Sequence, residues 1–340
     1  MRRTLLLSIY CLFLLIDATA QQLPLYTQYR DNWTQINPAS LYNGYINYEH
    51  DVAIGISHRQ QWTDPDLIGS PISTMAQFQY VVEDYNFFTG GYIVNDQTGN
   101  IGTTGIYGNF AYQIPLGKGR IDQTLSVGIS GGLVQYSVDL SMLEMTATNA
   151  YLGLSEKIFY PDFGAGLFYH YDDKFYAGVS IPQLFGLNLE VRNTVKPENP
   201  FTLMRVRHYY AVIGGYFDFD FLEGETAFIE PSLWIRYVEN VPLSFDVNIR
   251  YKPSDYFWLG VGYGSATVLP TVRTQVNTDP RPSIAPNKHI LHLEAGVTLP
   301  YIFQPEGNLK IGFGYDVQLS EYLNNFGNSF EIHVIYSWER

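Results

Sequence analysis

Hydrophobic and polar residues alternate along much of this chain with a period of two. The clearest case is its end, where Leu309 and Phe313 share one parity with other apolar residues and Lys310 falls on the opposite, polar parity. Residues 329–338 repeat the pattern. A period of two over about ten residues predicts an extended strand with one apolar and one polar face. The end of the chain is therefore predicted to be a β-hairpin.

The same alternation recurs from residue 51 onward and predicts an all-β fold. It gives fourteen antiparallel strands, over residues 52–60, 72–82, 87–94, 101–114, 123–136, 163–171, 175–181, 208–217, 227–237, 243–251, 256–263, 289–299, 309–319 and 329–338. Strands of this length with an apolar face fit a transmembrane β-barrel. A soluble β-sandwich can show the same alternation, so the period alone leaves both folds open.

The lengths of the connections favour the barrel. Long predicted connections fall on one side of the sheet, at residues 62–71, 138–161, 182–207 and 264–288. The connections on the other side are shorter, at residues 83–86, 172–174, 218–225 and 252–255. Outer-membrane barrels have long loops outside the cell and short turns in the periplasm. After residue 20, no stretch is apolar over the roughly 18 residues of a spanning helix, so a membrane location requires a closed barrel.

Residues 1–20 are typical of a secretory signal peptide. Arg2 and Arg3 precede an apolar run at residues 5–16, and Ala18-Thr19-Ala20 has the small-x-small pattern of a cleavage site. The apolar run is about 12 residues long, which is short of the roughly 20 that a spanning helix needs. We expect the exported chain to begin at Gln21.

The exported chain is predicted to have two parts. Residues 21–50 are polar and aromatic without a sustained period, and we expect them to form an irregular periplasmic segment. Residues 51–340 form the predicted outer-membrane barrel. No linker or repeat divides the barrel region into further domains.

Composition excludes several classes of function. The single cysteine, Cys11, lies in the signal peptide, which excludes disulfides, cysteine-ligated zinc and cysteine nucleophiles in the exported chain. The balance of 20 basic to 33 acidic residues argues against nucleic acid as a partner. The high counts of Tyr (28), Phe (21) and Gly (30) suit strands and membrane-interface belts.

Charged residues on the polar parity are predicted to point into the lumen. They are Glu230, Arg236, Asp246, Arg250, Glu294, Lys310, Asp316 and Glu331. Because both signs are present, these groups can pair with one another. The interior is therefore predicted to be a closed polar network rather than an open pore.

Two sets of residues have spacings that occur in metal sites. His289 and His292 form an H-x-x-H spacing, but on a strand this odd spacing sends the two rings to opposite faces, so no shared metal is expected. Acidic residues also cluster around Gly224, at Asp218, Asp220, Glu223 and Glu225. Phe219 and Phe221 stand where a calcium loop has ligands or solvated residues, which favours an acidic periplasmic turn.

No motif predicts catalysis or a cofactor. Gly260, Gly262 and Gly264 form G-x-G-x-G without a following helix, which indicates packing on one strand face beside Trp258 or Trp234 rather than nucleotide binding. Ser57 and His58 are neighbours, and neighbours on a strand point apart. The chain has no G-x-S-x-G elbow. An enzyme built from distant loop residues stays open as an alternative, since such sites assemble from positions far apart in sequence.

Three motifs follow one another along the chain: Tyr29 with Asn37-Pro38-Ala39, then Arg59-Gln60-Gln61-Trp62, and Arg207-His208-Tyr209-Tyr210. In order and spacing they resemble the PorP/SprF membrane proteins of the type IX secretion and gliding system of Bacteroidota. The Arg-Gln-Gln-Trp and Arg-His-Tyr-Tyr stretches are the most specific of them. Residues 161–166, 174–178, 242–246 and 314–320 are also similar to the family. The chain departs from it at residues 328–332, Asn-Ser-Phe-Glu-Ile, where Gly-Ser-His-Glu-Ile is usual.

The resemblance implies a non-enzymatic outer-membrane barrel without cofactors. Its expected partners are outer-membrane lipid, other type IX secretion components, peptidoglycan-associated periplasmic proteins, and a secreted surface protein or adhesin. In this interpretation residues 21–44 and the short turns face the periplasmic machinery, and the long loops contact the exported protein. The main alternative is a channel or transporter for a hydrophobic or small polar solute, because fourteen strands leave a lumen that is either plugged or conducting.

Overall fold

The computed structural model describes residues 23–40, 50–64, 69–117, 123–139, 155–172, 174–191, 201–218, 227–238, 243–266, 288–303, 305–320 and 327–340. The predicted signal peptide, residues 1–20, lies outside the described residues. So do residues 219–225 of the predicted acidic turn and most of the long connections.

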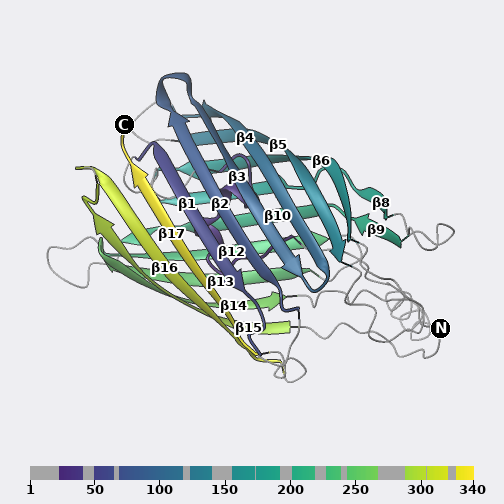
Figure 1. Cartoon of the computed structure of the whole chain (residues 1–340). Helices are drawn as coiled ribbons and strands as arrows, with labels where there is room; N and C mark the ends of the chain where they lie inside the picture. Colours follow the sequence, from purple (N-terminus) through teal and green to yellow (C-terminus); the bar gives the residue numbers. More distant parts are fainter. Residues whose placement is uncertain are drawn as a thin grey trace, which may run out of the picture.

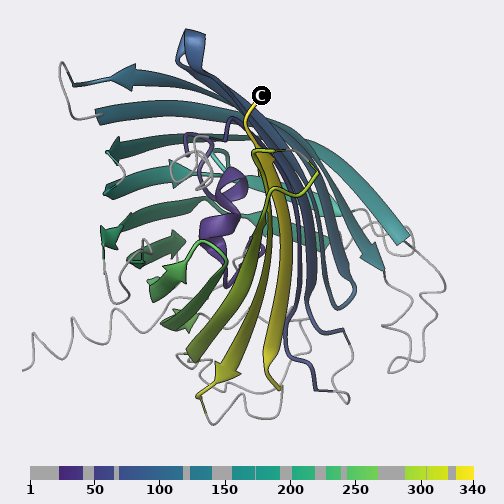
Figure 2. The same cartoon turned by 90° about the vertical axis from the view of Figure 1, so that its left-hand side faces the viewer.

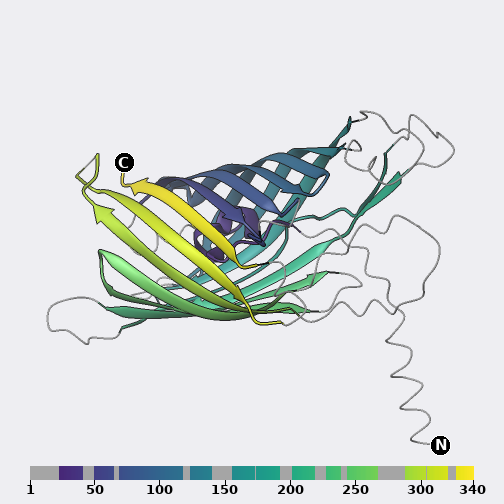
Figure 3. The same cartoon turned by 60° about the horizontal axis from the view of Figure 1, so that its bottom comes forward.

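The described strands form a closed antiparallel barrel (Figures 1 and 3). The first half of the ring consists of β1 (Val52–Gln60), β2 (Ile72–Val82), β3 (Phe87–Thr98), β4 (Ile101–Pro115), β5 (Gln123–Asp139), β6 (Ser155–Tyr171), β7 (Phe175–Ile181) and β10 (His208–Gly215). The second half consists of β12 (Phe228–Val238), β13 (Ser244–Ser254), β14 (Phe257–Ala266), β15 (Lys288–Pro300), β16 (Gly307–Gln318) and β17 (Ser329–Trp338).

The ring closes where β1 pairs with β17, the first strand of the barrel with the last. β10 pairs directly with β12, which follows it in the ring. The main sheet has 15 strands among the described residues, and without the two-residue β11 (Phe217–Asp218) fourteen form the ring. The predicted barrel and its strand count are confirmed. A closed ring leaves no sheet edge around the barrel at the level of these pairings, as lipid requires.

Side chains sort by parity as the sequence predicts. On β13, Val247 and Ile249 are about half exposed on the outside, while Asp246, Asn248 and Arg250 are buried on the inside. Many other exposed apolar residues, such as Ile129 on β5, also lie on strands, while a few, such as Tyr85 and Phe303, lie in turns at the barrel ends. The exterior is therefore an apolar surface suited to lipid, and the interior is polar.

The largest difference from the predicted strands is at β6. The strand begins at Ser155, eight residues before the predicted start at residue 163. Pro161 made this stretch resemble a loop, since proline lacks the N–H that a central strand donates. In the structure the pairing with β7 starts only at Ala165, so among the described strands Pro161 forfeits no ladder hydrogen bond.

The two ends of the barrel differ. The start of β1 and the end of β17 lie at the end with the short β2–β3, β6–β7 and β13–β14 connections, which we call the periplasmic end. The opposite end, the outer end, carries an additional hairpin that was not predicted (Figure 1). It consists of β8 (Leu187–Val191) and β9 (Phe201–Arg205), which pair only with each other among the described strands.

The described helices are single turns: η1 (Tyr29–Asp31), α2 (Trp33–Ile36) and η2 (Glu83–Tyr85). None of the described helices has the length and apolar content needed to cross a membrane.

Residues 23–40, which contain η1 and α2, lie inside the barrel, where Figure 2 shows the two helical turns surrounded by strands. We predicted an irregular periplasmic segment at residues 21–50, and for residues 23–40 the structure differs. Residues 26–40 are all buried. A segment enclosed by wall on every side needs no single apolar face, which is why it shows no period. We call residues 23–40 the plug.

Candidate functional site

The plug runs through the lumen from the outer end toward the periplasmic end. Leu23 lines a pocket together with Arg205, the last residue of β9 at the outer end. At the other end of the plug, the Ser40 carbonyl accepts a hydrogen bond of 3.0 Å from the Gln79 side chain, close to the periplasmic end of β2. The plug therefore spans most of the height of the barrel.

One side of the plug carries charges that pair with the wall. The Arg30 guanidinium lies 2.7 Å from the Glu294 carboxylate, and the Asp31 carboxylate lies 2.9 Å from the Arg250 guanidinium. Asp31 also forms an ion pair with Lys310. The buried Asp31 carboxylate thus lies between two cations, Arg250 and Lys310. Both plug charges are thus compensated by strands β13, β15 and β16.

The plug also bonds to the strands whose pairing closes the barrel. The backbone N–H groups of Thr27 and Gln28 donate to the Glu331 carboxylate on β17, over 2.6 and 3.2 Å. The Thr27 hydroxyl contacts the Asp316 carboxylate on β16 at 2.9 Å. Arg59 on β1 forms ion pairs with both carboxylates and donates to the Thr27 hydroxyl. This cluster, which we call the seam cluster, joins the first strand to the last two through the plug.

The other side of the plug is an aromatic core. The Tyr29 ring lies 5.0 Å from the Trp234 ring, measured between centroids, and the Trp33 ring lies 5.6 Å from Tyr176 and 5.8 Å from Phe168. All five side chains are almost fully buried. Because aromatic side chains bury large areas, this cluster stabilises the plug against the β6, β7 and β12 walls.

The Asn-Pro-Ala motif anchors the C-terminal part of the plug. The Asn37 amide donates to the carbonyls of Leu167 on β6 and Val179 on β7, over 3.0 and 3.4 Å. The Ser180 hydroxyl donates to the Ile36 carbonyl over 2.6 Å. Asn37 therefore bridges two neighbouring wall strands by hydrogen bonds to their main chains.

Glycines in the wall make room for this motif. A Cβ atom added at Gly128 would lie 2.5 Å from the main chain of Pro38 and Ala39. A Cβ atom added at Gly166 would lie 2.0 Å from the Asn37 side-chain oxygen. These positions need glycine because the plug approaches the wall this closely.

The structure places the eight charged residues predicted to face the lumen on the inside of the barrel. Lys310 is partly buried and the other seven are buried: Glu230, Arg236, Asp246, Arg250, Glu294, Asp316 and Glu331. Some of them pair within the wall. Arg236 lies 2.5 Å from Asp246, and His292 bridges Asp246 and Asp316 over 3.1 and 2.6 Å. Others pair with the plug, which sequence reasoning did not foresee.

The motif residues fall into two groups. Tyr29, Asn37, Pro38, Ala39 and Arg59 meet in or against the plug, with the Tyr29 hydroxyl 2.6 Å from that of Ser232. The others lie at the outer ends of β1 and β10. They are Gln60, Gln61 and Trp62 after the seam cluster, and Arg207, His208 and Tyr209 at the start of β10.

The structure separates the residues of the H-x-x-H and Ser-His motifs and describes only one residue of the acidic turn. His292 is buried in the lumen, whereas His289 is exposed outside, with a ring nitrogen 2.5 Å from the Tyr263 hydroxyl. Ser57 donates to Asn32 inside the barrel over 2.7 Å, while His58 contacts Thr74 over 2.8 Å. Asp218 ends the short β11, and the other acidic residues of that predicted turn lie outside the described residues.

The glycines at 260, 262 and 264 pack differently from the prediction. We expected them beside Trp258 or Trp234. A Cβ atom at Gly260 would instead meet Glu294 at 3.1 Å, and one at Gly264 would meet Asp246 at 2.0 Å. The space at Gly262 belongs to Asn248. The glycines make room for polar lumen side chains, because the charged network occupies this side of the barrel.

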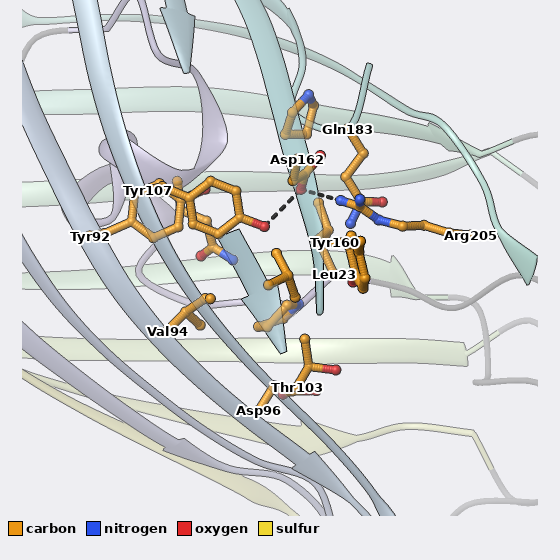
Figure 4. A pocket seen from close by; sticks show the side chains of 15 residues that line it. Leu23, Tyr92, Val94, Asp96, Thr103, Tyr107, Tyr160, Asp162, Gln183 and Arg205 are labelled. Carbon is orange, nitrogen blue, oxygen red and sulfur yellow. Dashed lines mark hydrogen bonds and ion pairs between the residues drawn. The ribbon is translucent and has the colours of Figure 1, made fainter. Parts of the chain in front are cut away.

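A small pocket opens beside the plug at the outer end (Figure 4). It has a volume of about 30 Å³. In this pocket Arg205 forms an ion pair with Asp162, and its guanidinium carbon lies 4.8 Å from the centroid of the Tyr160 ring. Asp162 also accepts a hydrogen bond of 2.7 Å from the Tyr107 hydroxyl. These contacts anchor the end of the β8–β9 hairpin to β4 and β6.

The chain matches the family model described as "Type IX secretion system membrane protein PorP/SprF" over residues 18–336. No curated protein matches the chain. Among solved structures, the chain is similar to the CymD monoaromatic hydrocarbon channel, with 10% identity, a TM-score of 0.47 and 95% of each chain covered. It is also similar to a Pseudomonas aeruginosa FadL homologue, with 11% identity, a TM-score of 0.46, and 89% of this chain and 92% of that chain covered.

The family match and the barrel together indicate where in the cell the protein lies. The family is one of membrane proteins, and the apolar exterior belongs to a closed antiparallel barrel. Barrels of this kind span outer membranes. The chain is therefore an outer-membrane protein.

A first prediction concerns the glycines that face the plug. Gly128→Ala is expected to lower the free energy of unfolding by about 1–3 kcal/mol, because the new methyl group collides with the Pro38 and Ala39 main chain. Urea unfolding in lipid vesicles, followed by tryptophan fluorescence, measures this. The control is Gly131→Ala on the same strand, whose Cβ would have nothing nearer than the Phe163 ring at 3.7 Å. Equal effects of the two variants would contradict the close packing of the motif.

A second prediction concerns the charges of the plug. Asp31→Asn leaves Arg250 and Lys310 without their shared carboxylate and is expected to cost about 3–5 kcal/mol in the same unfolding experiment. Adding Lys310→Met should recover part of the loss, since one unpaired cation is removed. Asp84→Asn, at an exposed periplasmic turn, serves as the control and should change little. If Asp31→Asn behaves like Asp84→Asn, the plug does not occupy the lumen in the membrane.

Proposed function

Because the chain belongs to the PorP/SprF family of type IX secretion system membrane proteins, we propose that it is a non-enzymatic scaffold of that machinery. In this proposal it anchors a secreted surface protein or adhesin, or helps to export it, and links it to periplasmic components. The proposal assigns no catalytic step and no cofactor to the chain. In this proposal the anchored adhesin would serve gliding, which is movement of the cell over a surface.

The filled lumen is the observation that favours a scaffold. On one side the plug pairs its charges with the wall, and on the other it buries Tyr29 and Trp33 among wall aromatics. Opening a passage would require breaking buried ion pairs and exposing this aromatic core to water, which is costly. A barrel with a packed interior is suited to holding partners at its two ends, whereas it offers no open passage for a solute.

The outer end has a feature suited to holding an exported protein. The β8–β9 hairpin stands apart from the ring, and the buried Arg205–Asp162 ion pair fixes its end to β6. Recognition commonly uses such segments on a rigid scaffold. We therefore assign the contact with the secreted protein to this hairpin and its neighbouring connections, and the contact with periplasmic and peptidoglycan-associated proteins to the short turns.

A transporter or channel for a hydrophobic or small polar solute is the competing function. It requires that the plug leave the lumen, or part from the wall, under working conditions. We predict that the purified protein gives no steady conductance in planar bilayers. A variant with Tyr29→Ala and Trp33→Ala, which loosens the aromatic side of the plug, should give intermittent current. A steady open channel in the unchanged protein would favour transport instead.

The scaffold function predicts which proteins copurify. From cells of its natural host, extraction in mild detergent should bring down an exported surface protein together with periplasmic components of the machinery, identified by mass spectrometry. Replacing residues 186–204 with a short Gly-Ser linker should abolish capture of the exported protein only. Tyr85→Ser, at the exposed η2 turn, should leave it captured. If the unchanged protein brings down neither class of partner, the proposed function is wrong.

A further inference from the structure

The outer pocket holds a carboxylate that has no cation beside it in the described part of the chain. Asp162, the other acidic residue of the pocket, is paired with Arg205. Asp96 accepts a hydrogen bond of 2.5 Å from the Ser73 hydroxyl, and no described cation pairs with it. In Figure 4, Asp96 lies on the side of the pocket away from the Arg205–Asp162 ion pair. Because enclosing a carboxylate with only a neutral partner is costly, the pocket suits a positively charged group.

A second acceptor in the pocket comes from the plug. Gln35 lines the pocket with 6% of its surface exposed, and its side-chain oxygen is buried without a hydrogen-bond partner in the described structure. A buried acceptor without a donor costs free energy. A ligand that carries a positive charge and also donates hydrogen bonds would satisfy Asp96 and Gln35 together.

The size of the pocket favours an ammonium group over a metal ion. Ca²⁺ takes roughly six to eight oxygen ligands, and Mg²⁺ usually keeps several waters. The pocket has a volume of about 30 Å³, which is room for only a few groups of the size of water at roughly 10–15 Å³ each. A primary ammonium is compact and donates its hydrogen bonds directly to acceptors such as these two oxygens.

The apolar part of the lining suits an alkyl chain on that ammonium. Leu23 and Pro24 of the plug line the pocket together with Val94 and Val134 of the wall. Long amine side chains lay their methylene groups on apolar surface while the charged end finds a polar environment. Leu23, Pro24 and Asp96 are partly exposed, so the pocket can be entered from the outer end.

We propose that the outer pocket binds a primary alkylammonium group, with Asp96 as its counter-ion and the Gln35 side-chain oxygen as a second acceptor. The group belongs either to a free amine or to a lysine side chain of another polypeptide. The second source rests on the proposed function, in which the lysine is carried by the exported protein held at the outer end. The bound ammonium joins strand β3 of the wall to the plug.

Binding of n-butylammonium, which reproduces the lysine side chain, tests the proposal. Saturation-transfer NMR at neutral pH follows the butyl resonances in the presence of the whole protein in detergent. Asp96→Asn is expected to weaken binding at least about tenfold, because the hydrogen bond to a charged acceptor is lost. Asp84→Asn, at the exposed periplasmic turn, is the matched control and should leave binding unchanged. Butyltrimethylammonium carries the charge without N–H donors and should also bind at least about tenfold more weakly.

A second variant leaves the wall carboxylate in place. Gln35→Leu removes the acceptor on the plug and is expected to weaken binding of n-butylammonium about threefold, which is the effect of one neutral hydrogen bond. Gln97→Leu changes an exposed glutamine next to Asp96 on β3 and should have no such effect.

A peptide distinguishes the two sources of the ammonium. Acetyl-Gly-Lys-Gly-amide should displace n-butylammonium, and the same peptide with an acetylated lysine should not. If the free amine binds and the peptide does not, the assignment to the exported protein is wrong. The whole proposal is overturned if n-butylammonium shows no saturable binding or if potassium at the same concentration displaces it. It is also overturned if Asp96→Asn and Gln35→Leu bind the amine like the unchanged protein. Copurification of the exported protein is a separate readout, so failure here is distinguishable from failure of the proposed function.

Discussion

Charges enclosed by a membrane barrel must be paired, because neither lipid nor a narrow lumen can solvate them. In this protein the requirement is met by the plug, a segment that is not one of the ring strands and lies inside the barrel. Arg30 and Asp31 of the plug face Glu294, Arg250 and Lys310 of the wall. Removing the plug would leave part of this wall network unbalanced. The charge pairing therefore explains why residues 23–40 stay inside the barrel.

The same pairing connects the plug to the closure of the ring. Arg59 on β1, Asp316 on β16 and Glu331 on β17 come together at Thr27 and nearby plug atoms. The pairing of β1 with β17 is the contact between the two ends of the barrel sequence. The plug, the seam cluster and the aromatic core thus form one interior, and the barrel is best described as a protein with a packed core rather than as a tube.

The sequence predicted the ring well, because parity is a direct consequence of strand geometry. Val247 and Ile249 alternate with Asp246 and Arg250, and this alternation is enough to assign the outside and the inside. The first half of β6 was not predicted as a strand because it contains Pro161. The free-energy cost of a proline in a strand depends on which side of the strand is hydrogen-bonded at that residue, and only the folded structure shows this.

The plug could not be predicted in the same way. Arg30, Asp31 and Trp33 contact three different regions of the wall, so no repeating pattern marks them. One sequence feature did point to them. An aromatic-rich stretch without a strand period lies next to the first strand of a barrel whose lumen is wide enough to need a plug or to conduct. The motif residues Asn37 and Arg59 were identified from a family resemblance, but their contacts with Gly166 and Thr27 emerge only from the fold.

The central claim is that residues 23–40 are a permanent part of the barrel interior. Hydrogen exchange of the backbone amides of Thr27 and Gln28 in the lipid-embedded protein tests it most directly, since both amides donate to the buried Glu331 carboxylate. The account predicts that these amides exchange as slowly as those in the middle of β16 and β17. Exchange at the rate of an unstructured peptide would contradict it.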